Sequence, residues 1–209
     1  MKTWLARSIG WAAPVWVAAA LCCGTARAAD VYLPTGPAPL VDSGNFFEAR
    51  FGVFAHGVGS VEEGTVDLNG SVVTPRIVPG VTGAFGFVVP RVHFGGAVNL
   101  SGRTSFGYTG LLWTIPVWDR LFVEAYVGPA VHNGSLIATP TLAGLGCPVL
   151  FHSGASVGYR FTERWSVMGT FEHLSNGKTL FGVNCGTNQA PVGSNQGLNN
   201  YGVRVGYSF

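Results

Sequence analysis

The sequence predicts an all-β fold, an eight-stranded antiparallel transmembrane β-barrel of the bacterial outer membrane. The first observation is the composition, since the 209-residue chain holds 31 glycines, many aromatic residues and only 11% charged residues. The second is that the chain after residue 28 has no sustained helical period and no apolar run of about 20 residues. The third is its short alternating segments between turns, which are typical of strands that cross a membrane.

Residues 1–28 have the features of a secretory signal peptide. A positively charged start and an apolar stretch lead to "ARA" at residues 26–28, which is a small-x-small cleavage site. We expect cleavage after Ala28 rather than lipidation of a cysteine in this segment. The mature chain, residues 29–209, is then long enough for one domain, the outer-membrane β-barrel.

The charge of the mature chain indicates which partners it lacks, and its cysteines indicate whether it holds a disulfide. Three of the twelve Lys and Arg residues fall in the signal peptide, and the remaining nine are balanced by ten Asp and Glu. We therefore expect no nucleic-acid partner. Two cysteines remain after cleavage, Cys147 and Cys185, and in an exported protein such a pair is a disulfide candidate. Two free thiols are the alternative.

Eight strands are expected from the alternation of polar and apolar residues. They lie near residues 44–56, 64–77, 91–101, 104–117, 120–132, 149–161, 164–175 and 198–209. Closure is required, because an open sheet edge in lipid would leave backbone groups unpaired. A closed barrel of this size has an interior filled by side chains, which disfavours a pore.

Each strand is expected to turn its apolar face to lipid and its polar face to the lumen. The last strand has the clearest period, with one apolar set on alternate positions: Tyr201, Val203, Val205, Tyr207 and Phe209. A bilayer solvates only that set, so the other face looks inward. The same argument places five charged residues in the lumen, as an interior salt-bridge network rather than a catalytic site: Glu48, Arg50, Glu124, Arg160 and Arg204.

The lengths of the connections predict the orientation of the barrel. Residues 118–120 and 162–164 make tight turns, as periplasmic turns are. The longer connections at about 132–148 and 177–197 are therefore expected outside the cell, with one cysteine in each. The segment 79–90 is long for a periplasmic turn. The seventh strand consequently ends at the outer rim.

The end of the seventh strand, "GTFEHLSNGK" at residues 169–178, carries polar residues that a strand does not need. His173 and Ser175 share a face with the aromatic residues of this strand and so face lipid, whereas Glu172 faces the lumen. A serine becomes a nucleophile when a nearby base takes its proton, and an amide such as Asn176 can stabilise an oxyanion. Spacing alone favours a plainer interpretation, in which these residues cap a barrel strand at the membrane interface.

The C-terminal residues resemble a known family. "FEHLSNGK", followed by a loop and "NQGLNNYGVRVGYSF", is similar to the lipid A 3-O-deacylase (PagL) family of outer-membrane acyl hydrolases over about the last 50 residues. That family is an eight-stranded barrel with a serine-hydrolase site on its lipid-facing wall, and it removes an ester-linked acyl chain from the 3-position of lipid A. The resemblance implies lipopolysaccharide as the substrate, Ser175 as the nucleophile, His173 as the base, and Asn176 and Gly177 at the oxyanion site.

One position departs from the family pattern. The family places a Glu after an Asn-x-Gly turn to orient the histidine, and the aligned residue here is Asn199, on the same face as His173. An amide oxygen can hold the imidazole but cannot stabilise an imidazolium, and losing a triad carboxylate can cost about 10⁴-fold in rate. We therefore expect a slower hydrolase, an enzyme for a different ester, or a catalytically weak or inactive structural or adhesive barrel of the same family.

The remaining histidines give no metal-ligand pattern. His56, His93, His132 and His152 are scattered over strands and loop edges, and no glycine cluster opens a helix. We expect no metal and no cofactor. The oligomeric state stays open, a homodimer included.

Overall fold

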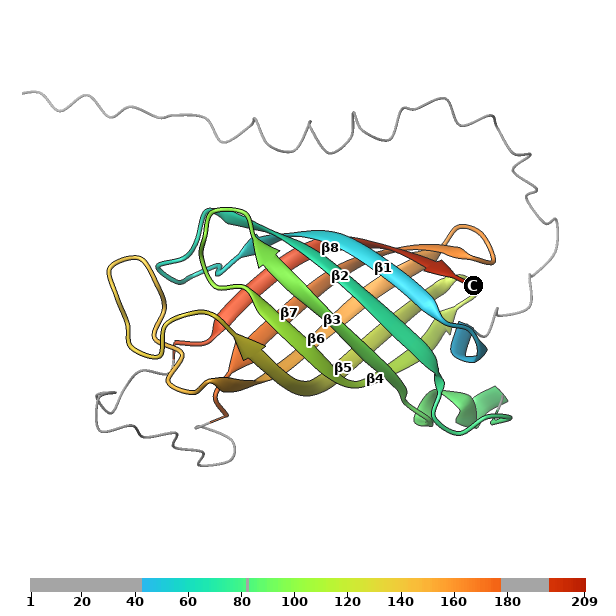
Figure 1. Cartoon of the computed structure of the whole chain (residues 1–209). Helices are drawn as coiled ribbons and strands as arrows, with labels where there is room; N and C mark the ends of the chain where they lie inside the picture. Colours follow the sequence, from blue (N-terminus) through green and yellow to red (C-terminus); the bar gives the residue numbers. More distant parts are fainter. Residues whose placement is uncertain (1–42, 82, 178–195) are drawn as a thin grey trace, which may run out of the picture. The chain divides into compact units, whose positions relative to one another are not determined.

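Eight strands pair in chain order and close into an antiparallel barrel (Figure 1). The computed structural model describes residues 43–81, 83–177 and 196–209, so the expected signal peptide lies outside the described residues. The strands are β1 (Glu48–His56), β2 (Thr65–Arg76), β3 (Arg91–Asn99), β4 (Phe106–Trp118), β5 (Leu121–His132), β6 (Val149–Arg160), β7 (Trp165–Ser175) and β8 (Leu198–Ser208). The fold class predicted from the sequence is confirmed.

The barrel closes between the first and the last strand. β1 pairs antiparallel with β8, in a register that runs from Glu48 opposite Ser208 to Ala55 opposite Tyr201. Every strand therefore has a hydrogen-bonded neighbour on both sides, which is what the hydrocarbon interior of a bilayer requires.

The strand boundaries lie within a few residues of those expected, and two differences have local causes. β1 begins at Glu48, later than expected, because Ser43–Asn45 forms the short 3-10 helix η1. β3 ends early, at Asn99, whose side-chain oxygen accepts hydrogen bonds from the backbone N–H groups of Ser101 (2.9 Å) and Arg103 (3.0 Å). An asparagine that bonds the backbone following it in this way begins a turn.

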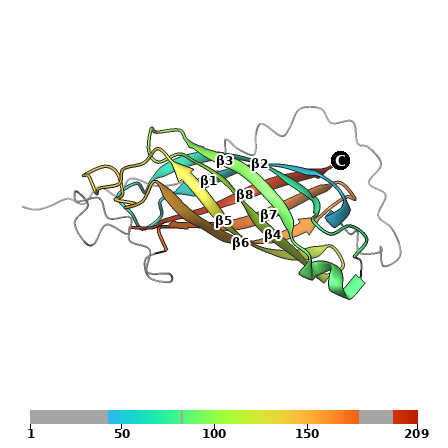
Figure 2. The same cartoon turned by 60° about the horizontal axis from the view of Figure 1, so that its bottom comes forward.

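The connections divide into a short-turn end and a long-loop end (Figure 1, Figure 2). At the end that carries the C-terminus, the β2–β3 connection contains the 3-10 helix η2 (Gly83–Val88), which accounts for its unusual length. Neither this helix nor any other in the described residues is long and apolar enough to cross a membrane. The opposite end carries the loops 57–64, 100–105 and 133–148.

The side chains alternate between an exposed apolar wall and a buried interior. In β1, every second residue from Glu48 to His56 is buried and each residue between them is exposed. In β8, Val203 is 57% exposed, whereas the neighbouring Arg204 is only 2% exposed. Apolar side chains outside and charges inside are the reverse of a water-soluble protein, and this arrangement suits a lipid environment.

Charged side chains in the lumen pair with one another, as the sequence predicted. Arg50 donates to Glu48 (3.0 Å) and to Glu124 (2.7 Å), and Arg91 also donates to Glu48 (3.2 Å). All four side chains are almost fully buried. A buried charge is tolerated only when it is paired, so this network is a condition of the fold.

The other two arginines expected in this network have different neighbours. Arg204 forms a buried ion pair with Glu172, which the sequence placed in the lumen without naming a partner. The Arg160 guanidinium lies over the ring of Phe122, 4.7 Å from its centroid. The pairing of Arg204 keeps the Glu172 carboxylate on the inner side of β7.

At the end of the barrel with loops 57–64, 100–105 and 133–148, one loop packs against the strands. Loop 133–148 contributes Ala143, Leu145 and Cys147, each at most 1% exposed, to an apolar cluster with strand residues. Cys147 is disulfide-bonded. Cys185, which the sequence predicted as its partner, lies outside the described residues. This loop is therefore held against the barrel by packing.

Candidate active site

The end of β7 presents His173 and Ser175 on the outer face of the barrel. Burial alternates along β7, with the residues of the same parity as Trp165 outward and Glu172 and Leu174 fully buried. The register places His173 opposite Asn199 on β8. The faces that the sequence suggested for these residues are those that the structure has.

The His173 imidazole is held by the side chain of Asn199. Its Nδ1 lies 2.7 Å from Asn199 Oδ1. Because an amide oxygen can only accept, Nδ1–H is the donor and a neutral imidazole keeps its lone pair on Nε2. Asn199 therefore fixes both the tautomer and the orientation that a general base needs.

Gly197 is a second neighbour of the imidazole, and sequence reasoning did not single it out. A Cβ atom at Gly197 would lie 2.8 Å from His173 Cε1 and 3.3 Å from Nε2. The ring thus occupies space that any larger residue would take. The glycine of "NQGLN" was visible in the sequence, but its contact with His173 depends on where β8 starts.

Ser175 lies two residues beyond His173 on the same face. Consecutive same-face residues of a strand are about 7 Å apart at Cα. Among the described residues, no hydrogen bond joins the Ser175 hydroxyl to the imidazole. In unliganded sites such bonds are commonly long and tighten when substrate binds. The two side chains therefore share the outer face of β7 without a formed contact.

Asn176 and Gly177 follow directly after β7 and turn the chain. Asn176 is 6% exposed. Gly177 has a φ of 68°, in the left-handed region where glycine is favoured. A left-handed residue in a turn is one of the conformations in which consecutive backbone N–H groups converge, as an oxyanion site requires.

The site is a polar island in an apolar wall. On the outer faces of β6, β7 and β8, the residues other than apolar or aromatic side chains and Gly169 are four: Ser153, His173, Ser175 and Asn199. Ser153 lies opposite His173 on β6 and was not predicted. The proximity of Ser153 to His173 could not be predicted without the register between β6 and β7.

Aromatic rings surround this island on the lipid side. Phe171 and Tyr201 contact each other with ring centroids 4.9 Å apart, and Trp165 and Tyr207 do so at 4.8 Å, at the start of β7. They provide an apolar surface along which acyl chains can lie. Among the described residues, no group of His, Cys, Asp and Glu side chains has the arrangement of a metal site.

Fold and site together define an outer-membrane β-barrel with a His-x-Ser-Asn site on its lipid-facing wall. Residues 117–208, which span β5 to β8, match the family model described as lipid A 3-O-deacylase (PagL). The resemblance predicted from the C-terminal residues is confirmed over this part of the chain, and the protein is a bacterial outer-membrane protein. No curated protein matches the chain.

One solved structure supports the same fold, and two others are similar to the chain. The crystal structure of the outer membrane enzyme PagL is 15% identical, with a TM-score of 0.53, covering 78% of this chain and 99% of that chain. A de novo designed transmembrane β-barrel is 13% identical, with a TM-score of 0.49, covering 79% of this chain and 96% of its own. The N-terminal barrel domain of Pseudomonas aeruginosa OprF is 12% identical, with a TM-score of 0.48, covering 79% and 98%.

Proposed function

We propose that the protein hydrolyses a fatty-acyl ester at the 3-position of lipid A, with lipopolysaccharide of the outer leaflet as its substrate. The observation that carries the proposal is the His173–Asn199 pair on the lipid-facing wall, with Nδ1 and Oδ1 2.7 Å apart and Ser175 next on the same face. The match of residues 117–208 to the deacylase family supports the substrate class.

The mechanism follows from the groups at the site. Lipid A enters sideways from the outer leaflet, and Ser175 Oγ attacks the ester carbonyl while His173 Nε2 takes its proton. Asn176 and the backbone N–H of Gly177 stabilise the oxyanion. His173 then returns the proton to the departing sugar oxygen, which leaves an acyl-serine. A water molecule, deprotonated by His173, cleaves that ester and releases the fatty acid.

Asn199 makes this a weakened triad. It holds the imidazole in the useful tautomer, but it carries no charge to stabilise the imidazolium that forms in each step. Glu172 is no substitute, because its carboxylate is fully buried on the lumen side and paired with Arg204. A rate reduced by as much as about 10⁴-fold is expected relative to a site with a carboxylate.

The same residue favours a second candidate function. A barrel whose triad carboxylate is an asparagine also suits a catalytically weak or inactive relative with a structural or adhesive role. The two candidates differ in one respect that can be measured, which is whether lipid A loses an acyl chain.

Mass spectrometry of lipid A separates these candidates. The protein is expressed in a lipopolysaccharide-bearing outer membrane as wild type, as Ser175→Ala and as Ser166→Ala, a matched control on the lumen face of β7. Loss of one hydroxyacyl chain with wild type and Ser166→Ala, and not with Ser175→Ala, is the expected result. Identical spectra for all three would support the structural role.

A further inference from the structure

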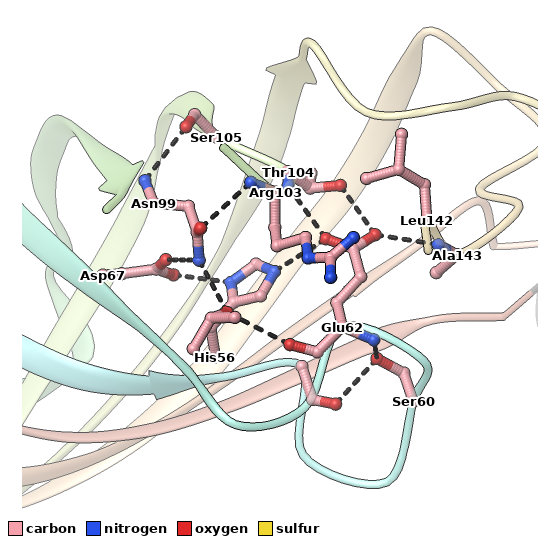
Figure 3. A network of polar contacts seen from close by, with 12 residues as sticks. His56, Ser60, Glu62, Asp67, Asn99, Arg103, Thr104, Ser105, Leu142 and Ala143 are labelled. Carbon is pink, nitrogen blue, oxygen red and sulfur yellow. Dashed lines mark hydrogen bonds and ion pairs between the residues drawn. The ribbon is translucent and has the colours of Figure 1, made fainter. Parts of the chain in front are cut away.

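A buried polar cluster connects the extracellular loops (Figure 3). His56, the last residue of β1, lies between two carboxylates, with Nδ1 2.7 Å from Asp67 Oδ2 and Nε2 3.0 Å from Glu62 Oε2. All three residues are 0% exposed. An imidazole that donates from both nitrogens is an imidazolium, so the cluster is a cation held between two anions.

Glu62 is the centre of this cluster. Its carboxylate accepts the backbone N–H of Thr104 (2.8 Å), the Thr104 hydroxyl (2.9 Å) and the backbone N–H of Ala143 (2.8 Å). One side chain of loop 57–64 therefore holds the backbones of loops 100–105 and 133–148, as Figure 3 shows. Hydrogen bonds to a buried charge are stronger than neutral ones, and their loss leaves buried donors unsatisfied.

From Ala143 the connection continues to the active site. The next residue, Gly144, donates its N–H to Gln196 Oε1 (3.2 Å), and Gln196 donates its N–H to the Gly144 carbonyl (3.2 Å). Gln196 directly precedes Gly197, against which the His173 ring lies. The position of loop 133–148 therefore sets the position of the imidazole's neighbour.

A second connection runs from the start of loop 57–64. Gly57 donates its N–H to Asn200 Oδ1 (2.8 Å), and Val58 donates its N–H to the Asn199 carbonyl (2.8 Å). The first residues of β8 are thus held from two loops. Glu62 bonds Ala143 of the first connection and His56, which directly precedes Gly57 of the second.

We infer that Glu62 is a positioning residue for the His173–Asn199 pair, an inference that rests on the proposed function. Its charge holds loop 133–148 and the His56 end of β1, which together fix where β8 begins. Replacing one of its two oxygens by an NH₂ group, as in a glutamine, leaves the N–H of either Thr104 or Ala143 without an acceptor. The β8 start then relaxes, and the imidazole loses its alignment with Ser175.

The experiment compares Glu62→Gln with Glu63→Gln in the full-length barrel. Glu63 is the matched control, because within the described part of the chain this neighbouring carboxylate bonds only the exposed loop backbone at Gly59 N (2.9 Å). Two quantities are measured, the kinetics of ester hydrolysis on lipopolysaccharide vesicles and the ¹⁵N signal of the His173 side chain. That signal is assigned by its loss in His173→Gln.

Glu62→Gln is expected to lower kcat by about 10- to 100-fold with KM little changed, since misalignment affects chemistry more than binding. It is also expected to shift the His173 Nδ1 signal, while Glu63→Gln changes neither quantity. A His173 signal that is the same in both variants overturns the inference.

Two further outcomes are distinguishable. If the wild type does not hydrolyse lipid A, the proposed function fails, yet the His173 signal still tests whether Glu62 positions the imidazole. If Glu62→Gln does not fold, Gln196→Ala takes its place, because it removes only the side-chain bond to Gly144. A shift of the His173 signal in Gln196→Ala relative to wild type supports the inference, and an unchanged signal overturns it.

Discussion

Polar side chains are paired with one another in the lumen, whereas only some of those described on the lipid-facing wall are. In the lumen, Arg50 is bonded to Glu48 and Glu124, and Arg204 to Glu172. On the wall, the polar residues of β6 to β8 gather in one island, where the described residues give a hydrogen bond only between His173 and Asn199. Charges in the lumen satisfy one another and stabilise the barrel, whereas the island keeps groups available for a substrate.

The sharpest way to break this comparison is to substitute His173. His173→Gln removes the base and leaves the lumen untouched, so we expect hydrolysis to fall by about 10³- to 10⁴-fold with no loss of barrel stability. Rates on lipopolysaccharide vesicles and urea unfolding midpoints check the two halves of this statement. A loss of stability equal to that of a lumen variant would mean that His173 is structural.

A lumen substitution should give the reverse result. Arg50→Met leaves the buried carboxylate of Glu124 without its cation and Glu48 with Arg91 alone, and we expect a destabilisation of about 3–5 kcal/mol. The folded fraction should keep its activity. Urea unfolding measures the change, with Arg164→Met as the control, since Arg164 is an exposed turn residue whose substitution should leave the midpoint unchanged. Equal midpoints for both variants would contradict the account of the lumen.

A substitution that places a carboxylate beside His173 on the wall also tests this comparison. Asn199→Glu supplies the carboxylate that stabilises an imidazolium, and we expect the hydrolysis rate to rise by about tenfold or more. Asn199→Ala, which leaves Nδ1 without an acceptor, should lower it. Unchanged or lower activity in Asn199→Glu would mean that the site is built differently from a weakened triad.

The smallest expected effect is a pH dependence at the buried polar cluster of His56, Glu62 and Asp67. Burial raises the pKa of Glu62, but hydrogen bonds from His56 and from the backbone N–H groups of Thr104 and Ala143 outweigh it and lower the pKa from 4.5 to about 2. A carboxyl with a lowered pKa stabilises the fold above its unfolded value, and this contribution is lost as the pH falls towards the folded value.

The loops should therefore stay held at pH values above about 4.5 and loosen as the pH falls to about 2. The amide resonances of Thr104 and Ala143 check this expectation, with a midpoint near the lower value in wild type and no transition in Glu62→Gln. A wild-type midpoint at the ordinary value of 4.5 would mean that these hydrogen bonds do not form.

The fold and the faces of the site could be predicted because both depend on a two-residue period. The alternation in β8 gives the lipid face, and the aromatic residues of β7 give the face of His173 and Ser175. The start of β1 could not be predicted, because the short turn Ser43–Asn45 has no period to reveal it.

The neighbours of the site could not be predicted, because they depend on strand register and loop paths. Ser153 meets His173 only through the pairing of β6 with β7, and Gly197 only through the position of the β8 start. His56 was one of four scattered histidines in the sequence. Its partners Glu62 and Asp67 become visible only when the loop between them is folded.

The most direct test of the central claim is covalent labelling with a lipid-soluble fluorophosphonate, which reacts with a serine whose hydroxyl is activated by a base. The purified barrel in lipopolysaccharide vesicles is treated with the probe, and peptide mass spectrometry locates the adduct. We predict an adduct on Ser175 in wild type and none in His173→Gln. An unlabelled wild type, or equal labelling of Ser175 in both proteins, would contradict the claim that these two residues act together on the lipid-facing wall.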